Sequence, residues 1–215
     1  MDRVQLEKDY RDWGRLYLRL QKKVAIFVEE VADGHTDIDI EKIDQRNGIK
    51  ALEKILVNNE DVEKYKENPG YGSLFDVKDI AGVRITLNTE HDLLAFATSL
   101  ENEAKRKFVA VHRDGHGAYS SEGSGTSPQK RSSPFYDAVH LTVTDGCRLG
   151  DVERELHCEI QMRTVLGDAW AVQDRKYLYE KTVRGESQEL SEAISQIHRG
   201  CEKVWSLVKK RSKAE

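Results

Sequence analysis

The sequence predicts an α/β fold in which a mixed sheet of about five strands is flanked by helices. Three observations predict it: amphipathic stripes with a spacing of three or four residues near both ends, a central region in which apolar residues recur at every second position, and helical segments between those strands. The 215 residues suffice for a sizeable core. We expect an N-terminal helix over residues 1–34, a central domain over 35–182 and a C-terminal helix over 183–215.

The first elements are predicted from a change of period. Apolar or aromatic side chains recur every three or four residues from Tyr10 to Val31, which predicts the buried face of a helix that ends near Gly34. Ile38 and Ile40 then alternate with aspartates and predict a strand, and a short helix follows over residues 51–56. A proline and two glycines within residues 69–72 break the chain there.

The rest of the predicted domain is a strand, a helix and three further strands. Alternation predicts a strand over residues 83–87, and Thr89 with Asp92 three positions later resembles a capping box that opens a helix through Leu100. Further strands are expected over 108–112, 139–144 and 156–163. The segment from 114 to 134 is rich in Gly, Ser and Pro, so its composition favours disorder, while its place between two strands also fits a lid.

Composition excludes several classes of protein. The 34 Lys and Arg against 38 Asp and Glu give a net charge of −4, which excludes a histone-like cationic coat but allows a local basic pocket. No stretch approaches the about 18 consecutive apolar residues of a membrane span, and the N-terminus is charged, so we expect a cytoplasmic protein with no membrane partner. The three cysteines form neither a disulfide framework nor a zinc pattern.

The polar faces of the predicted strands carry the residues suited to chemistry. Residues 156–163 alternate, so that His157, Glu159, Gln161 and Arg163 share one face. Asp79 precedes the strand that carries Arg84. Two carboxylates among cations are what a Mg²⁺–nucleotide site needs, although alternation also describes the solvated side of an antiparallel sheet. Neither GxxxxGK[ST] nor GxGxxG occurs, which excludes a P-loop and a Rossmann site.

Three separated motifs resemble the RelA/SpoT-type alarmone synthetase domain. They are Asp79-Ile80-Ala81-Gly82-Val83-Arg84-Ile85, then Tyr136-x-x-x-His140, and then Glu159-Ile160-Gln161-Met162-Arg163-Thr164 with Ala169-Trp170-Ala171 beyond it. Their order and spacing over residues 35–182 are those of that domain, and three motifs in register are more specific than any one of them. The short chain is similar to a stand-alone small alarmone synthetase.

The resemblance implies a reaction in which the β,γ-pyrophosphate of ATP moves to a ribose 3′-hydroxyl, AMP is released and Mg²⁺ is the cofactor. It implies that Asp79 and Glu159 hold the metal and that Glu159 also assists the attacking hydroxyl. The implied ATP-binding residues are Arg46, Lys50, Lys54 and Arg84. The implied acceptor-binding residues are Tyr136, His140, Gln161 and Arg163. Independently of the resemblance, Lys130 and Arg131 lie in the segment from 114 to 134 and are suited to contact phosphates if that segment acts as a lid.

Departures from the family pattern concern the substrates more than the reaction. The stretch from Arg46 to Lys54 aligns with the family's basic donor motif only with a gap, and Asp137 replaces a cation, which should disfavour a highly phosphorylated acceptor if Asp137 faces the site. We expect a guanine nucleotide, GTP or GDP, as acceptor. The alternatives are an adenine nucleotide, the 3′ end of tRNA, or a catalytically weak nucleotide-binding regulatory module. The two terminal stripes could also join copies of the chain in a homo-oligomer.

Overall fold

The computed structural model describes residues 3–45, 47–55, 73–116 and 138–174, together with 196–197, 200–201 and 203–204. Within these residues, five strands form one sheet in the order β1-β2-β5-β4-β3. The strands are β1 (Ile40–Gln45), β2 (Ala81–Leu87), β3 (Ala110–His116), β4 (Ala138–Leu149) and β5 (Val152–Thr164). Strands β2 and β5 run parallel, whereas the other neighbours run antiparallel. This mixed, helix-flanked sheet confirms the predicted fold class.

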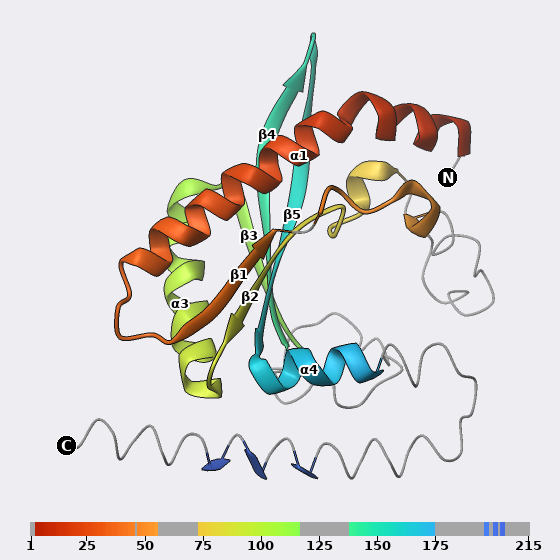
Figure 1. The fold of residues 1–215 in the computed structure, drawn as a ribbon. Coiled ribbons are helices and arrows are strands. Elements are labelled where there is room, and N and C mark those ends of the chain that lie inside the picture. The colour runs from red at the N-terminus through yellow and green to blue at the C-terminus, as the bar shows by residue number, and fades with distance from the viewer. Residues whose placement is uncertain are drawn as a thin grey trace.

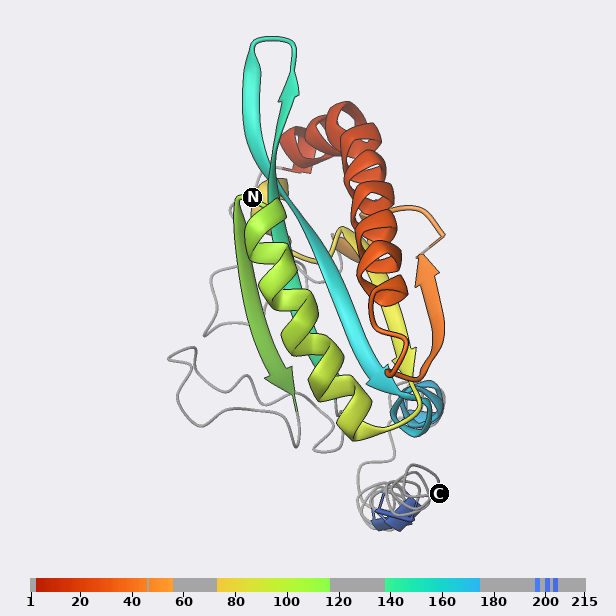
Figure 2. The same ribbon diagram turned by 90° about the vertical axis from the view of Figure 1, so that its left-hand side faces the viewer.

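Two long helices cover the same face of the sheet. Helix α1 (Arg3–Asp33) crosses β2 and β5, and helix α3 (Glu90–Lys107) packs beside it (Figure 1, Figure 2). A short 3₁₀ helix, η1 (Leu74–Asp76), precedes β2. Helix α4 (Val165–Asp174) follows β5 directly and lies at the lower end of the sheet in Figure 1. None of the helices within the described part of the chain is long and apolar enough to cross a membrane.

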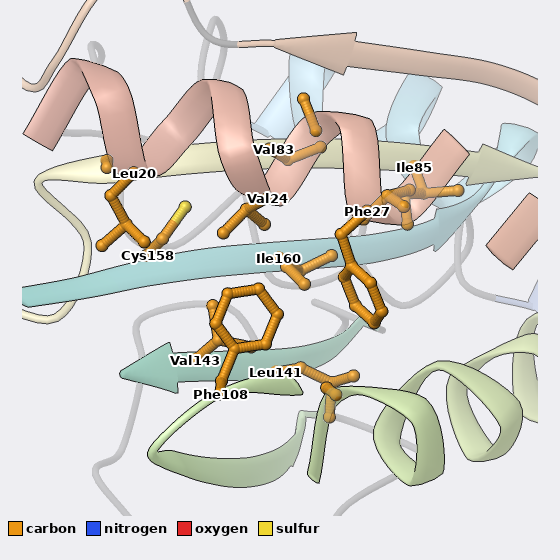
Figure 3. Packing of buried hydrophobic residues seen from close by; sticks show 14 of the residues in the cluster. Leu20, Val24, Phe27, Val83, Ile85, Phe108, Leu141, Val143, Cys158 and Ile160 are labelled. Carbon is orange, nitrogen blue, oxygen red and sulfur yellow. The ribbon is translucent and has the colours of Figure 1, made fainter. Parts of the chain in front are cut away.

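The core lies between α1, α3 and the face of the sheet that they cover. Leu20, Val24 and Phe27 of α1 point at apolar side chains of β2 and β5, among them Val83 and Ile160 (Figure 3). Each such side chain is almost fully buried. Burying one contributes about 1.5–3 kcal/mol, so the predicted N-terminal stripe fixes α1 on the sheet.

Tyr17 is an exception within this apolar stripe of α1. Its side chain is fully buried, and its hydroxyl has no hydrogen-bond partner within the described residues. Burial is the largest of the effects that raise the pKa of Tyr17, so the phenol stays neutral. A buried hydroxyl without a partner lowers stability, because it gives up its hydrogen bonds to water on folding.

The start of α3 confirms the predicted capping signal. Thr89 is the N-cap residue, and its Oγ1 accepts a hydrogen bond from the backbone N–H of Asp92 at 3.1 Å. The Thr89 hydroxyl in turn donates to Oδ2 of Asp92 at 2.6 Å. Both residues are buried, so these bonds satisfy polar groups that would otherwise destabilise the helix end.

The predicted first strand begins too early in the sequence. Residues 34–38 form a turn in which the N–H groups of His35 and Ile38 donate to Ala32 and His35, and pairing with β2 begins only at Ile40. Ile38 packs against the core from this turn. Its apolar character therefore reflects the partial burial of this one side chain in a mostly exposed turn, and not a strand.

The predicted strand over 108–112 is also displaced. Phe108 caps the C-terminus of α3, where its N–H donates to Ala104, and its ring makes an edge contact with Phe27. Strand β3 begins at Ala110 and continues to His116, into the segment whose composition favours disorder. The rest of the segment from 117 to 134 lies outside the described residues.

The last two strands are longer than predicted and form a hairpin. Cross-strand pairs run from Val139 with Met162 to Leu149 with Val152, and Figure 1 shows the tip extending beyond the rest of the sheet. Gly150 in the connection has a φ of 60°, which favours glycine. The outer half of the hairpin carries polar residues on both faces, so apolar alternation could not predict it.

Two of the predicted helices are described only in part. Residues 52–55 form a single helical turn within the predicted 51–56, and the break at 69–72 lies outside the described residues. Most of the C-terminal stripe also lies outside them. Its described positions are helical, and Ile197 and Val204 are 64% and 60% exposed. The homo-oligomer stays a prediction.

Candidate active site

The candidate site is built on the face of the sheet opposite α1 and α3. Strand pairing places Arg84 of β2 beside Gln161 of β5, and Gln161 beside His140 of β4. The neighbouring row places Gly82 beside Glu159, and Glu159 beside Thr142. The predicted polar faces of three strands therefore form one polar surface.

Glu159 lies at the centre of this surface with both carboxylate oxygens engaged. Nδ1 of His140 lies 2.8 Å from Oε1, and the Gln161 amide donates to Oε2 at 2.7 Å. A carboxylate can only accept, so Nδ1 of His140 carries the hydrogen. The Glu159 side chain is 13% exposed and that of His140 is 4% exposed. The orientation of the Glu159 carboxylate is thus fixed, while its remaining lone pairs can bind a metal ion or a substrate hydroxyl.

Asp79, which lies just before the first residue of β2, and Lys50 form a second group. Nζ of Lys50 lies 3.0 Å from Oδ1 and 2.8 Å from Oδ2 of Asp79. The backbone holds Lys50 in place, because its N–H donates to Ile80 at 2.7 Å and its carbonyl accepts from the Tyr10 hydroxyl at 3.0 Å. Burial, and then the charge of Glu53, raise the pKa of Tyr10, so this phenol remains a donor. The structure therefore unites two of the predicted residues through an ion pair.

Arg84 and Arg163 meet at a residue outside the predicted site, Asp168. Nη1 of Arg84 lies 3.3 Å from Oδ1 of Asp168, and Nη1 of Arg163 lies 3.4 Å from the same oxygen. Asp168 is in α4, immediately before the Ala169-Trp170-Ala171 motif. Its position next to that motif is the signal that could have pointed to it.

The acidic groups fit a magnesium–nucleotide site. Within the described residues, no three His, Cys, Asp or Glu side chains gather to hold a metal ion by themselves. Mg²⁺ typically needs only one or two protein carboxylates and takes its other oxygens from phosphates and water. The cation Lys50 already lies on both oxygens of Asp79, which shows that a positive group is accommodated there. Asp79 and Glu159 are the residues that would hold the ion.

The other predicted residues are placed only in part. Lys54 is exposed on the helical turn at 52–55 and belongs to none of these three groups. Arg46, Tyr136 and both lid residues, Lys130 and Arg131, lie outside the described residues. Their predicted contacts with ATP and the acceptor remain predictions.

His157, on the same polar face, makes a hydrogen bond between strands. His157 lies two positions before Glu159, and its Nδ1 is 2.9 Å from the Thr144 hydroxyl. Burial, followed by the charge of Lys78, lowers the pKa of His157, so the ring stays neutral near pH 7. Its neighbour Cys158 is buried on the opposite face.

The match to a known family comes from the part of the chain that builds this site. Residues 39–184 match the sequence model of a family described as a region found in RelA / SpoT proteins. The chain belongs to the RelA/SpoT family. This confirms the resemblance drawn from the three motifs. None of the curated proteins compared with the chain matches it.

Solved structures of small alarmone synthetases share the fold of this RelA/SpoT chain. Small alarmone synthetase 1 from Bacillus subtilis, bound to its product pppGpp, is 19% identical with a TM-score of 0.72, over 96% of this chain and 99% of that one. The same enzyme bound to AMPCPP is 17% identical with a TM-score of 0.62, over 99% and 100%. Small alarmone synthetase 2 from that organism is 21% identical with a TM-score of 0.63, over 94% and 99%.

Proposed function

We propose that this chain transfers pyrophosphate from ATP to the ribose 3′-hydroxyl of a nucleotide and releases AMP, in a Mg²⁺-dependent reaction. The observation that carries the proposal is the Glu159 carboxylate, held by His140 and Gln161 on the strand that pairs with the Asp79 motif. Membership of the RelA/SpoT family and full-length similarity to small alarmone synthetases support it.

The proposed donor side combines Lys50, which is paired with Asp79, with Lys54 and Arg84. In the proposal, Lys50 and Lys54 bind the phosphates of ATP, and Arg84 lies against the adenine. Lys50 lies on Asp79, so it is within reach of any phosphate that approaches the carboxylate. When bound by Asp79 and Glu159, Mg²⁺ would neutralise phosphate charge and make the β-phosphorus a better electrophile. The relative whose structure holds AMPCPP, an ATP analogue, supports a donor of this kind.

The acceptor side uses Glu159 as the proton acceptor. The 3′-oxygen attacks the β-phosphorus of ATP, the bond from that phosphorus to the oxygen bridging the α-phosphate breaks, and AMP leaves. The hydroxyl proton passes to Glu159, whose orientation is fixed by His140 and Gln161. A fixed carboxylate at hydrogen-bond distance contributes typically 10²–10⁴-fold as a general base. Tyr136 completes the proposed acceptor side, and Arg163, whose side chain is 4% exposed, supports that side from within the protein.

We propose a guanine nucleotide, GTP or GDP, as the acceptor in the cytoplasm. The relative bound to pppGpp, a guanine nucleotide product, supports this choice. Adenine nucleotides and the 3′ end of tRNA remain the alternatives within the same chemistry. A regulatory module that binds nucleotides without turnover is the alternative outside it.

One assay separates these functions. The purified chain is incubated with ATP, Mg²⁺ and, in turn, GTP, GDP, ATP alone or deacylated tRNA, and AMP release and product mass are measured. We expect AMP and a pyrophosphorylated guanine nucleotide in equal amounts. AMP formation only with tRNA or an adenine nucleotide would reassign the acceptor. Binding of ATP without AMP release with any acceptor would refute the enzyme and leave the regulatory module.

A further inference from the structure

Asp168 is held at a defined position at the start of α4. The Thr164 hydroxyl oxygen accepts a hydrogen bond from the N–H of Gly167 at 3.0 Å, which caps the N-terminus of the helix. Thr164 is the buried last residue of β5, and it pairs with Leu87 of β2. The carboxylate one position beyond the capped N–H is therefore fixed relative to both strands.

The two arginines that meet Asp168 come from these neighbouring parallel strands. Arg163 pairs with Thr86, and Arg84 pairs with Gln161, so both lie on the polar face within two positions of one another. Their Nη1 atoms lie 3.4 Å and 3.3 Å from the same Oδ1 of Asp168. One carboxylate oxygen thus joins β2, β5 and α4.

The two arginines differ in their exposure. The side chain of Arg163 is 4% exposed, whereas that of Arg84 is 34% exposed. Arg163 is therefore enclosed by protein, while part of the Arg84 side chain remains accessible, although its Nε is buried. Asp168, at 28%, connects the enclosed arginine to the accessible one.

We propose that Asp168 is a positioning residue that holds the guanidinium of Arg84 in the orientation in which it contacts the nucleotide donor. An exposed arginine has many rotamers, and ordering such a side chain on binding weakens affinity. Asp168 orders it beforehand through Oδ1. This inference rests on the proposed function for the identity of the donor, ATP, and adds a residue that the family resemblance did not supply.

The test is a double-mutant cycle read out by binding. Calorimetry measures the affinity of AMPCPP with Mg²⁺ for the full chain and for the variants Asp168→Asn, Arg84→Ala and the combination of both. We expect Asp168→Asn to weaken binding about three- to tenfold, the range for ordering one long side chain. In the Arg84→Ala background, the same substitution still removes the pair with Arg163 but should change affinity less than about twofold, because Arg84, through which Asp168 is proposed to act, is absent.

Controls separate positioning from a general effect on the fold. Asp145→Asn removes another ion pair between elements, with Lys23 at 2.6 Å, and should leave AMPCPP affinity unchanged. Asp168→Glu retains the charge and should recover part of the affinity, even if Asp168→Asn melts at a lower temperature. In steady-state assays, Asp168→Asn should raise KM for ATP with little change in kcat.

The outcomes are distinct for the inference and for the proposed function. Equal weakening by Asp168→Asn with and without Arg84 would overturn the inference, and so would tighter binding, which would mean that Asp168 competes with phosphate. A wild-type chain that binds no AMPCPP would also overturn it. A wild-type chain that binds AMPCPP but releases no AMP would refute the enzyme alone, because the cycle requires no turnover.

Discussion

Replacing Glu159 with Gln removes one negative charge from the centre of the polar surface and changes little else. The amide is nearly isosteric and keeps one oxygen, which can accept from His140 or from Gln161. The Gln161 amide can rotate to present its own oxygen to the new NH₂ group. The strand and the apolar face around Ile160 are not touched, so we expect a stability change below about 1 kcal/mol.

The expected loss is in turnover. If Glu159 accepts the proton of the attacking hydroxyl, kcat should fall at least about 10²-fold, equivalent to about 2.7 kcal/mol of transition-state stabilisation. AMPCPP affinity should fall much less, because Arg84 and Lys50 remain. AMP release at saturating ATP and acceptor measures kcat, and calorimetry measures the affinity for AMPCPP.

Glu155→Gln is a matched control for this substitution. Glu155 lies four positions earlier on β5, on the same face but exposed and paired with Gly146 near the hairpin tip. It should keep wild-type turnover. Near-normal AMP release by Glu159→Gln, with a melting temperature equal to that of the wild type, would refute the reasoning and leave Glu159 as part of a solvated strand face.

Three further predictions concern single side chains. Asp79→Asn should lower turnover, and raised Mg²⁺ should restore part of it if Asp79 is a metal ligand, whereas lost stability without rescue would indicate a structural residue. Tyr17→Phe should raise the free energy of unfolding by about 1 kcal/mol in urea titrations, and a decrease would show that the hydroxyl is bonded. Burial alone would raise the pKa of Glu101, but Lys105 and Arg113 outweigh it and lower that pKa below 4.5. The stability that Glu101 contributes is thus present above pH 4.5 and lost as pH falls through the lowered pKa, so Glu101→Gln should flatten the loss of stability between pH 5 and pH 3.

Local signals predicted the elements whose residues interact with near neighbours. Thr89 caps α3 as its spacing to Asp92 indicates, because an N-cap needs only residues three positions away. Alternation wrongly predicts strands at Ile38 and Phe108, since an apolar residue in a turn or at a helix end packs against the core for the same reason as one in a strand. Alternation of apolar residues indicates which side chains are buried, whereas hydrogen-bonded pairing with another strand decides which of them belong to a sheet.

The candidate site was predictable as a set of residue types but not as a set of contacts. Alternation on β5 placed Glu159 and Gln161 on one face, and the structure agrees. The ion pair of Lys50 with Asp79 and the meeting of two arginines at Asp168 depend on how distant segments pack, which no local period encodes. Asp168 by itself reads as an ordinary acid in the first turn of a helix.

Parallel strands β2 and β5 are far apart in the sequence, so we expect this site to assemble late in folding. The junction of these strands pairs Gly82 with Glu159, and α3, β3 and β4 lie between them in the sequence, so β5 can bring Glu159 beside the Asp79 strand only after those elements have formed a compact domain. Closing such a distant contact is slow compared with forming the β4–β5 hairpin. A chain shortened before β5 would keep α1, the Asp79 motif and His140 yet lack Glu159, Gln161 and Arg163 of the proposed acceptor side. Regained turnover after dilution from denaturant would therefore report the docking of β5 against β2, and not merely the formation of helices.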